Sequence, residues 1–302
     1  MTNLRQVAYG VPSNNDALTV RFGIEDGIFK AQGIDLSVHV VYGGPEIAAA
    51  FDTGAVSIGS LGAPSGIPAM AAGKQFRVIA SGCRQKPHMF LGVRKGLDTY
   101  EQLKGKKIGL LSIGSCPSWI VQKILSHHGL EAGRDVDLVP LNEDYPHIID
   151  FVRDGRIDAC LATEPNLSIG EDQDILNIWA AAYDDRYLPR FQWIVRVANL
   201  DLIEHDPELI ETVLRGCRRS ARHAHQNAGR FAQFIARYYG ASQQAAERAV
   251  RRELPLYQLD CELDMVGLQN AVDMLHELGG IDRPRNAAEF TDLRFQPVSL
   301  EA

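Results

Sequence analysis

A run of small polar residues around one thiol is the segment of this chain best suited to hold a ligand. It reads Ser112-Ile113-Gly114-Ser115-Cys116-Pro117-Ser118-Trp119 and follows a short apolar run at 107–111. Because proline is favoured at the first position of a helix, we expect Ser115 or Cys116 to be an N-cap. Free backbone N–H groups and the positive end of the helix dipole attract anions there. The run therefore predicts an anion-binding loop made by Gly114, Ser115, Cys116, Ser118 and Trp119, with an ordinary helix cap as the alternative.

The thiol in this run also permits a catalytic interpretation. A cysteine at a helix N-terminus has a stabilised thiolate and acts as a nucleophile when a base is within reach. His88 and His147 are the histidines near plausible cleft loops. We favour Cys116 as a small cap residue in a binding cleft, so no catalytic residue is assigned. Cys116 with His88 stays the alternative pair.

The elements that must position these residues follow an alternating pattern. Short β-branched runs alternate with helical segments up to about residue 170, which predicts an α/β fold with mostly parallel sheets. The expected strands are 6–9, 35–41, 56–58, 76–80, 107–111, 137–141 and 159–162, and the expected helices between them are 18–30, 45–52, 64–71, 117–128 and 146–153. From residue 207 onward the pattern is helical, over 207–226, 230–239, 243–253 and 264–278.

An internal repeat predicts two similar lobes. The segments 51–59 and 152–160 both read as a helix end, a glycine and a strand. Extended segments at 89–94 and 192–197 bracket the second unit. We therefore expect a discontinuous lobe I, residues 1–93 plus 194–302, closed by the C-terminal helices, and a lobe II of residues 94–193. Two crossings between the lobes form a hinge that lets them close over a ligand.

Ligands of open α/β sheets bind beyond the carboxyl ends of the strands, which adds further loops to the expected site. The loop residues selected on this basis are Pro12, Ser13, Asn14, Gly43, Gly44, Gly62, Ala63, Pro64, Ser65, Thr163 and Glu164. Aromatic rings also line clefts and stack on ligands, and the candidates are Trp119, Tyr145, Tyr187 and Trp193. Glu164 is expected either to receive a ligand cation or to pair with an arginine across the hinge.

Several short motifs, in order, resemble the SsuA/THI5-like (NMT1-like) family. They are the segments 27–36, 53–59, 62–64, 103–109, 154–159, 164–165 and 205–210. The resemblance covers the chain to about Gly280 and implies a type II periplasmic-binding-protein fold. It implies a solute-binding protein of the nitrate, sulfonate, taurine and pyrimidine-precursor class. In that family the loop corresponding to 112–119 carries Ser or Thr residues that hold an anionic or polar group.

Composition excludes several classes of function. The net charge is −7, from 31 Lys and Arg against 38 Asp and Glu, which disfavours nucleic acid as a partner. No apolar run is long enough for membrane insertion. The five cysteines show no C-x-x-C spacing, and neither a metal site nor a cofactor is expected. Residues 1–6 do not read as a signal peptide, so a cytoplasmic location is expected. A periplasmic or lipid-anchored location is the alternative if a leader was removed.

Three functions remain in competition. The first is a solute-binding protein that closes on a small anionic or heteroaromatic ligand, such as a sulfonate, a carboxylate or a pyrimidine-like compound. An ABC permease is its partner if the protein is exported. The second is a cytosolic enzyme on the same scaffold, of the pyrimidine-synthesis or desulfinase/decarboxylase type. Against this second function, the chain lacks the C-C-C-F-C motif and the loop histidine of the pyrimidine synthases. It also has Val11-Pro12 where the desulfinases place their cysteine. The third is a cytoplasmic ligand sensor.

Overall fold

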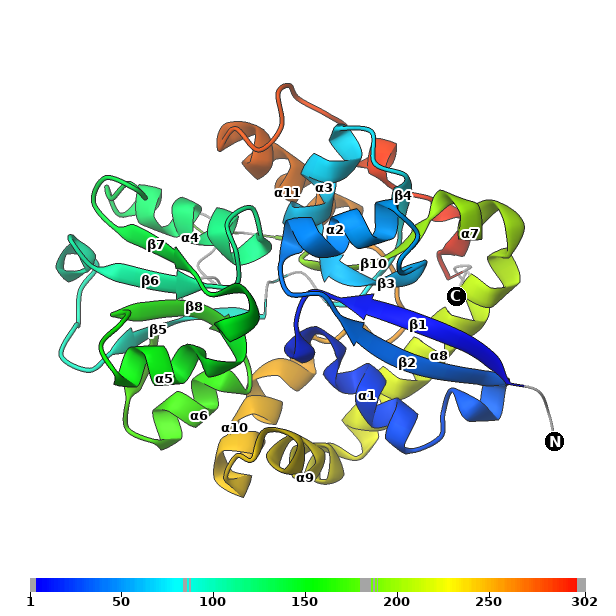
Figure 1. Cartoon of the computed structure of the whole chain (residues 1–302), viewed down its shortest axis with the longest axis horizontal. Coiled ribbons are helices and arrows are strands. Elements are labelled where there is room, and N and C mark those ends of the chain that lie inside the picture. The colour runs from blue at the N-terminus through cyan, green and yellow to red at the C-terminus, as the bar shows by residue number, and fades with distance from the viewer. Residues whose placement is uncertain are drawn as a thin grey trace.

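The computed structural model describes residues 4–83, 86, 88–179, 186, 188 and 190–297. These residues form two lobes side by side, each built on a five-stranded sheet (Figure 1). The aromatic candidate Tyr187 lies outside the described residues.

The first sheet has the strand order β2-β1-β3-β10-β4. Its members are β1 (Arg5–Val11), β2 (Ile34–Val40), β3 (Ile58–Gly62), β4 (Phe76–Ser81) and β10 (Ile194–Asn199). Strands β2 and β3 both run parallel to β1, whereas β10 runs antiparallel to its neighbours β3 and β4. The sheet is therefore mixed, because the strand that returns from the other lobe enters it in the opposite direction.

The second sheet repeats this plan with the order β7-β6-β8-β5-β9. Its members are β5 (Met89–Arg94), β6 (Lys107–Leu110), β7 (Asp137–Pro140), β8 (Ala159–Thr163) and β9 (Leu176–Trp179). Strand β5 runs antiparallel to β8 and β9, and the other pairs are parallel. The expected lobe boundary at 93/94 cuts through β5, which pairs entirely within the second sheet. We therefore propose that the first crossing between the lobes precedes Met89.

Helices cover both faces of the first sheet (Figure 1). On one side lie α2 (Gly44–Asp52), α3 (Ala63–Ala71) and α11 (Met265–Glu277), and on the other lie α1 (Leu18–Glu25) and α8 (Pro207–Gln226). Helix α8 buries an apolar stripe at helical spacing that includes Leu209, Val213 and Cys217. Its arginines Arg215 and Arg219 are exposed. The short helix α7 (Leu200–His205) joins β10 to α8.

The second sheet is flanked by α4 (Cys116–His127), α5 (Ile148–Arg153) and α6 (Asn166–Asp172). Two expected helices are shorter than predicted. Helix α1 ends at Glu25, and the chain then turns through Gly27, whose φ is +73°. Helix α5 starts at Ile148 because the preceding residues form the 3-10 turn Asn142–His147. Strand β9, at the edge of the sheet, was not predicted.

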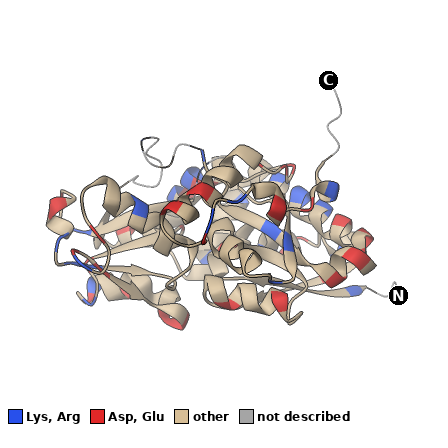
Figure 2. Cartoon of the chain, turned by 90° about the horizontal axis from the view of Figure 1, so that it is seen from above, with Lys and Arg blue, Asp and Glu red and all other residues tan. Residues whose placement is uncertain are grey.

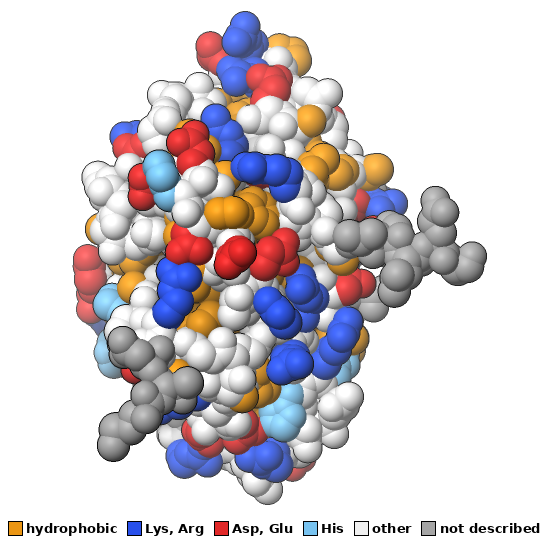
Figure 3. Space-filling view, turned by 90° about the vertical axis from the view of Figure 1, so that its right-hand side faces the viewer, with side chains coloured by type: hydrophobic (Ala, Val, Ile, Leu, Met, Phe, Trp, Pro, Cys, Tyr) orange, Lys and Arg blue, Asp and Glu red, His pale blue; other side chains and the backbone are white. Residues whose placement is uncertain are grey.

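The C-terminal helices reach from the first lobe to the second. Helices α9 (Ala228–Tyr239) and α10 (Gln243–Glu253) pack on each other, and α10 also packs on α6 of the second lobe. Figure 1 shows α10 below the junction of the two lobes. Basic and acidic positions alternate along both lobes in Figure 2, and they are mixed on the outer face of the first lobe in Figure 3. The charge of −7 is thus spread over the surface.

Candidate functional site

A narrow cavity lies where the loops after the strands of the two lobes meet. Its lining residues are Pro12, Ser13, Asp16, Gly44, Gly62, Ser65, Met89, Leu111, Ser115, Cys116, Pro117, Tyr145, Thr163 and Trp193. The space in which the centre of a water molecule fits is about 20 Å³. That is room for one or two waters, so the lobes are closed and must separate before an organic molecule enters.

Much of the predicted site lies on this cavity. The predicted residues that line it are Pro12, Ser13, Gly44, Gly62, Ser65, Ser115, Cys116, Thr163 and Trp193, and the aromatic candidate Tyr145 joins them. The predicted residues outside the lining are Asn14, Gly43, Ala63, Pro64, Gly114, Ser118, Trp119 and Glu164. Trp119 turns away, since its ring packs on Gly280 and its Nε1 donates to Gly114 O at 3.1 Å. Asn14 Nδ2 instead donates to the Tyr42 hydroxyl at 3.1 Å.

Sequence reasoning missed four lining residues, of which Pro117 was predicted only as the first residue of a helix. Met89 and Leu111 are apolar residues at strand ends, and no local signal separates them from ordinary core residues. Asp16 did carry a signal, because it is a carboxylate in the same strand-end loop as Pro12 and Ser13.

The N-terminus of α4 has the cap that the sequence predicts. Ser115 is the N-cap, with φ −74° and ψ 163°, and Pro117 is the second residue of the helix. The N–H groups of this loop already have partners. The Cys116 N–H donates to Ser65 Oγ of the first lobe at 3.0 Å, and the Gly114 N–H donates to Ser118 Oγ at 2.9 Å. In the closed lobes a protein hydroxyl therefore occupies the position at which an anion was expected.

Two glycines allow the lobes to approach this closely. A Cβ atom on Gly62 would lie 2.7 Å from Cys116 Cβ in the opposite lobe. A Cβ atom on Gly44 would lie 2.9 Å from the Cα atom of Ser115 and 2.3 Å from Ser65 Oγ. Separations under about 3 Å are shorter than core packing allows unless atoms move. A side chain at either position would therefore hold the lobes apart.

The alternative catalytic pair lacks the ionisation states that it would need. Cys116 is buried, and burial raises the pKa of its thiol well above the ordinary value, so the thiol stays protonated at neutral pH. Burial lowers the pKa of His88 to about 4, and its Nε2 lies 2.9 Å from Leu256 O. His88 packs edge-on against Trp193 and does not line the cavity. His147 has an exposed side chain that pairs with Asp150.

Asp16 is the one acidic residue of the described lining, which contains no Lys, Arg or His. The carboxyl lies in the 3-10 turn Asn14–Ala17 directly after β1 and the loop at Pro12 and Ser13. Ser13 Oγ donates to Asp16 Oδ2 at 2.5 Å. Burial raises the pKa of Asp16 to about 6, and hydrogen bonds from Ser13 oppose this only in part. The cavity thus carries negative charge at neutral pH.

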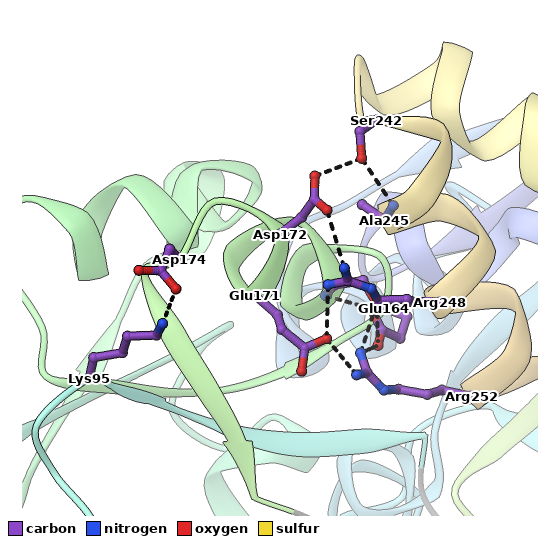
Figure 4. A network of polar contacts seen from close by, with 10 residues as sticks. Lys95, Glu164, Glu171, Asp172, Asp174, Ser242, Ala245, Arg248 and Arg252 are labelled. Atoms are coloured by element: carbon purple, nitrogen blue, oxygen red, sulfur yellow. Dashed lines mark hydrogen bonds and ion pairs between the residues drawn. The ribbon is translucent and has the colours of Figure 1, made fainter.

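Glu164 lies beside the cavity and joins the lobes (Figure 4). It is buried, accepts hydrogen bonds from Ser168 N–H and Oγ at 2.9 Å, and pairs with Arg252 of α10 at 2.8 Å. Arg252 also pairs with Glu171 at 2.6 Å. Burial is the largest influence on Glu164 and raises its pKa, although Arg252 opposes it. Of the two partners expected for Glu164, a ligand cation or an arginine, the structure therefore shows the arginine.

A second buried carboxyl stands next to this pair. Glu253 accepts a hydrogen bond from the Tyr257 hydroxyl at 2.8 Å and one from the Glu164 N–H at 3.3 Å. Burial raises its pKa well above the ordinary value. Across the described residues, no group of three or more His, Cys, Asp or Glu side chains is arranged to hold a metal ion.

Comparison with known proteins identifies the family of this chain. The model of the family described as NMT1/THI5 like matches residues 14–229, which is more than half of the chain. The chain belongs to the NMT1/THI5-like family. The matched region includes the cavity residues from Asp16 to Trp193. A Bacillus subtilis (strain 168) relative named "Putative binding protein YtlA" is 27% identical over 158 residues, which are 51% of this chain and 47% of that protein. The match therefore spans about half the length of that relative.

Solved structures show the same fold over nearly the whole chain. The alkanesulfonate-binding protein SsuA from Xanthomonas axonopodis pv. citri, bound to MOPS, superimposes with a TM-score of 0.81 at 15% identity, covering 97% of this chain and all of that one (100%). The ligand-binding component of an ABC-type import system from Staphylococcus aureus gives a TM-score of 0.75 at 11% identity, with 96% and 97% covered. The two-lobe periplasmic-binding-protein fold is therefore confirmed. None of the described helices has the length and apolar character needed to cross a bilayer.

Proposed function

We propose that this protein is a solute-binding protein that closes its two lobes on a small organic ligand and releases it unchanged. The observation that carries the proposal is a cavity lined by strand-end loops of both lobes, with Gly44 and Gly62 leaving room for closure. Membership of the NMT1/THI5-like family and the likeness to SsuA support it. The ligand classes in view are those expected from the sequence: sulfonates, carboxylates and pyrimidine-like heteroaromatic compounds.

Binding without turnover is favoured over catalysis by the state of the candidate nucleophile. A catalytic thiol needs a lowered pKa and a general base whose pKa lies near the working pH. Cys116 has a raised pKa, and the pKa of His88 is about 4. Neither residue is poised for acid–base work, although Cys116 lines the cavity.

Thermal-shift screening followed by isothermal titration against the three ligand classes tests the proposal. We expect saturable stabilisation, with the ligand recovered chemically unchanged from the complex. The matched variant is Cys116→Ser, which keeps the size of the side chain and should bind the same ligand. Ligand consumption by the wild type that stops in Cys116→Ser would establish the enzyme instead, and failure of every class to stabilise the protein would remove the proposal.

The proposed partner is an ABC permease, by analogy with the import component from Staphylococcus aureus. A transporter receptor acts outside the cytoplasmic membrane, whereas a ligand sensor works in the cytoplasm. Fractionation of cells that express the native gene separates these two roles. Recovery of the protein with the cytoplasmic fraction would favour the sensor.

A further inference from the structure

The cavity proposed as the ligand site offers a carboxylate where the sequence predicts an anion receptor. Asp16 lines the cavity, and none of the described lining residues is a Lys, Arg or His. The hydrogen bonds that the structure gives this carboxyl come from Ser13 and from its own backbone. Asp16 is half-buried, and a carboxylate partly withdrawn from water is stabilised by donors or by a counter-charge. The described lining supplies no such charge.

The start of α4, where Ser115, Cys116 and Pro117 line the cavity, is poorly suited to an anion. Ser65 Oγ accepts the Cys116 N–H at 3.0 Å, and Ser118 Oγ accepts the Gly114 N–H at 2.9 Å. The Ser118 hydroxyl in turn donates to Ser115 O at 3.0 Å. The donors at the start of α4 are thus engaged within the protein, and an anion would have to displace Ser65 while lying near the Asp16 carboxylate.

Two aromatic side chains complete the cavity. Tyr145 and Trp193 both line it and are buried. The faces of such rings attract cations and pack against flat ligands. A carboxylate and two rings around a narrow space form a receptor for a flat group with N–H bonds.

We infer that the ligand presents a basic nitrogen group, either protonated or carrying N–H bonds, to the Asp16 carboxylate, as an aromatic amine or amidine would. This inference rests on the proposed function, because it assigns a ligand class to the same cavity. The ligand group that the closed lobes recognise is then a nitrogen base, in place of the anionic group expected from the sequence. A charge-assisted hydrogen bond of this kind is short and strong in a dry site.

The electrostatic surroundings of Asp16 agree with this ligand class. The groups that interact with its charge are Cys116 on α4, Tyr145 before α5, Tyr239 on α9, Glu253 on α10 and Tyr257 after it. None of them is a cation, and Glu253 adds a second carboxyl. Because the pKa of Asp16 is about 6 in the free protein, binding of a cationic ligand should weaken as the pH falls through that value. Glu253 also titrates, so the Asp16→Asn variant is needed to assign the effect.

The test is isothermal titration of wild type and Asp16→Asn with four single-ring probes: benzamidine and benzylamine as nitrogen bases, benzoate and benzenesulfonate as anions. We expect the wild type to prefer the nitrogen bases. Asp16→Asn, which keeps the shape of the side chain and an acceptor for Ser13, should bind them about tenfold to a hundredfold more weakly. The pH dependence of that binding should disappear in the variant.

Several results would overturn the inference. They are tighter binding of the anions than of the bases by the wild type, equal binding of the bases by Asp16→Asn, or no binding of either base. If the lobes close on an anion and Asp16→Asn leaves that affinity unchanged, the inference fails while the proposed function stands. If no ligand of any class stabilises the protein, or the bound ligand is consumed, the proposed function fails.

Discussion

Replacing Asp16 by Asn should stabilise the ligand-free protein at neutral pH, although it removes a residue of the proposed site. In the folded chain the pKa of Asp16 is about 6, against an ordinary value of 3.8. Below about pH 4 the carboxyl is protonated in the folded protein and largely so in the unfolded chain. As the pH rises from there, the unfolded chain loses its proton first, so the free energy of unfolding falls until the folded carboxyl ionises as well.

The size of this effect follows from the two pKa values. A difference of one pKa unit between the folded and unfolded states corresponds to about 1.36 kcal/mol. Through this group the wild type should therefore lose about 2.5 kcal/mol of unfolding free energy between about pH 4 and pH 7. The asparagine variant has no proton to exchange. The difference in unfolding free energy, variant minus wild type, should therefore grow by that amount over the same range, whatever constant offset the amide introduces.

Urea unfolding of both proteins, followed by tryptophan fluorescence at several pH values, measures this difference. Asp154→Asn is the matched control, because Asp154 is exposed, follows α5 and does not line the cavity. The control should follow the pH dependence of the wild type. A difference between Asp16→Asn and wild type that stays flat with pH, or that shrinks as the pH rises, would refute the account of Asp16 as a half-buried carboxylate without a counter-charge.

Three further predictions concern closure of the lobes. Gly62→Ala should weaken ligand binding about tenfold or more in isothermal titration, because the new Cβ meets Cys116 at 2.7 Å in the closed state. The double variant with Cys116→Gly should recover affinity, and failure to recover it would count against steric blocking. Cys116 should react slowly with iodoacetamide in the wild type and faster in Gly62→Ala, and equal rates would argue against closed lobes. Arg252→Gln should lower the free energy of unfolding by about 3 kcal/mol, because Glu164 loses its partner. The exposed neighbour variant Arg251→Gln should have little effect in the same urea titration. An equal loss of unfolding free energy in both variants would show that the Arg252–Glu164 pair does not stabilise the fold.

The sequence alone determined the architecture and most of the loops that meet at the cavity. Strands and helices alternate with periods that depend on residues close together in the chain, so β1, β6 and β8 were predictable. The strand expected at 56–58 was wrong in its bounds, because β3 runs over Ile58–Gly62. The repeated segments 51–59 and 152–160 indicated two lobes for the same local reason. The strand-end rule then selected residues such as Ser13, Gly62 and Thr163 without knowledge of any contact between them.

The tertiary structure alone decided the chemistry of the site. Whether an N–H group is free depends on what the other lobe brings against it, and Ser65 brings a hydroxyl to Cys116 across 51 positions of the chain. Partial burial in the folded chain also raises the pKa of Asp16, which a local pattern cannot predict. Tertiary packing also pairs the Glu164 carboxylate with Arg252, which lies 88 positions away in the chain. Ionisation and donor occupancy are set by burial and by long-range partners, so they appear only once the two lobes are placed together.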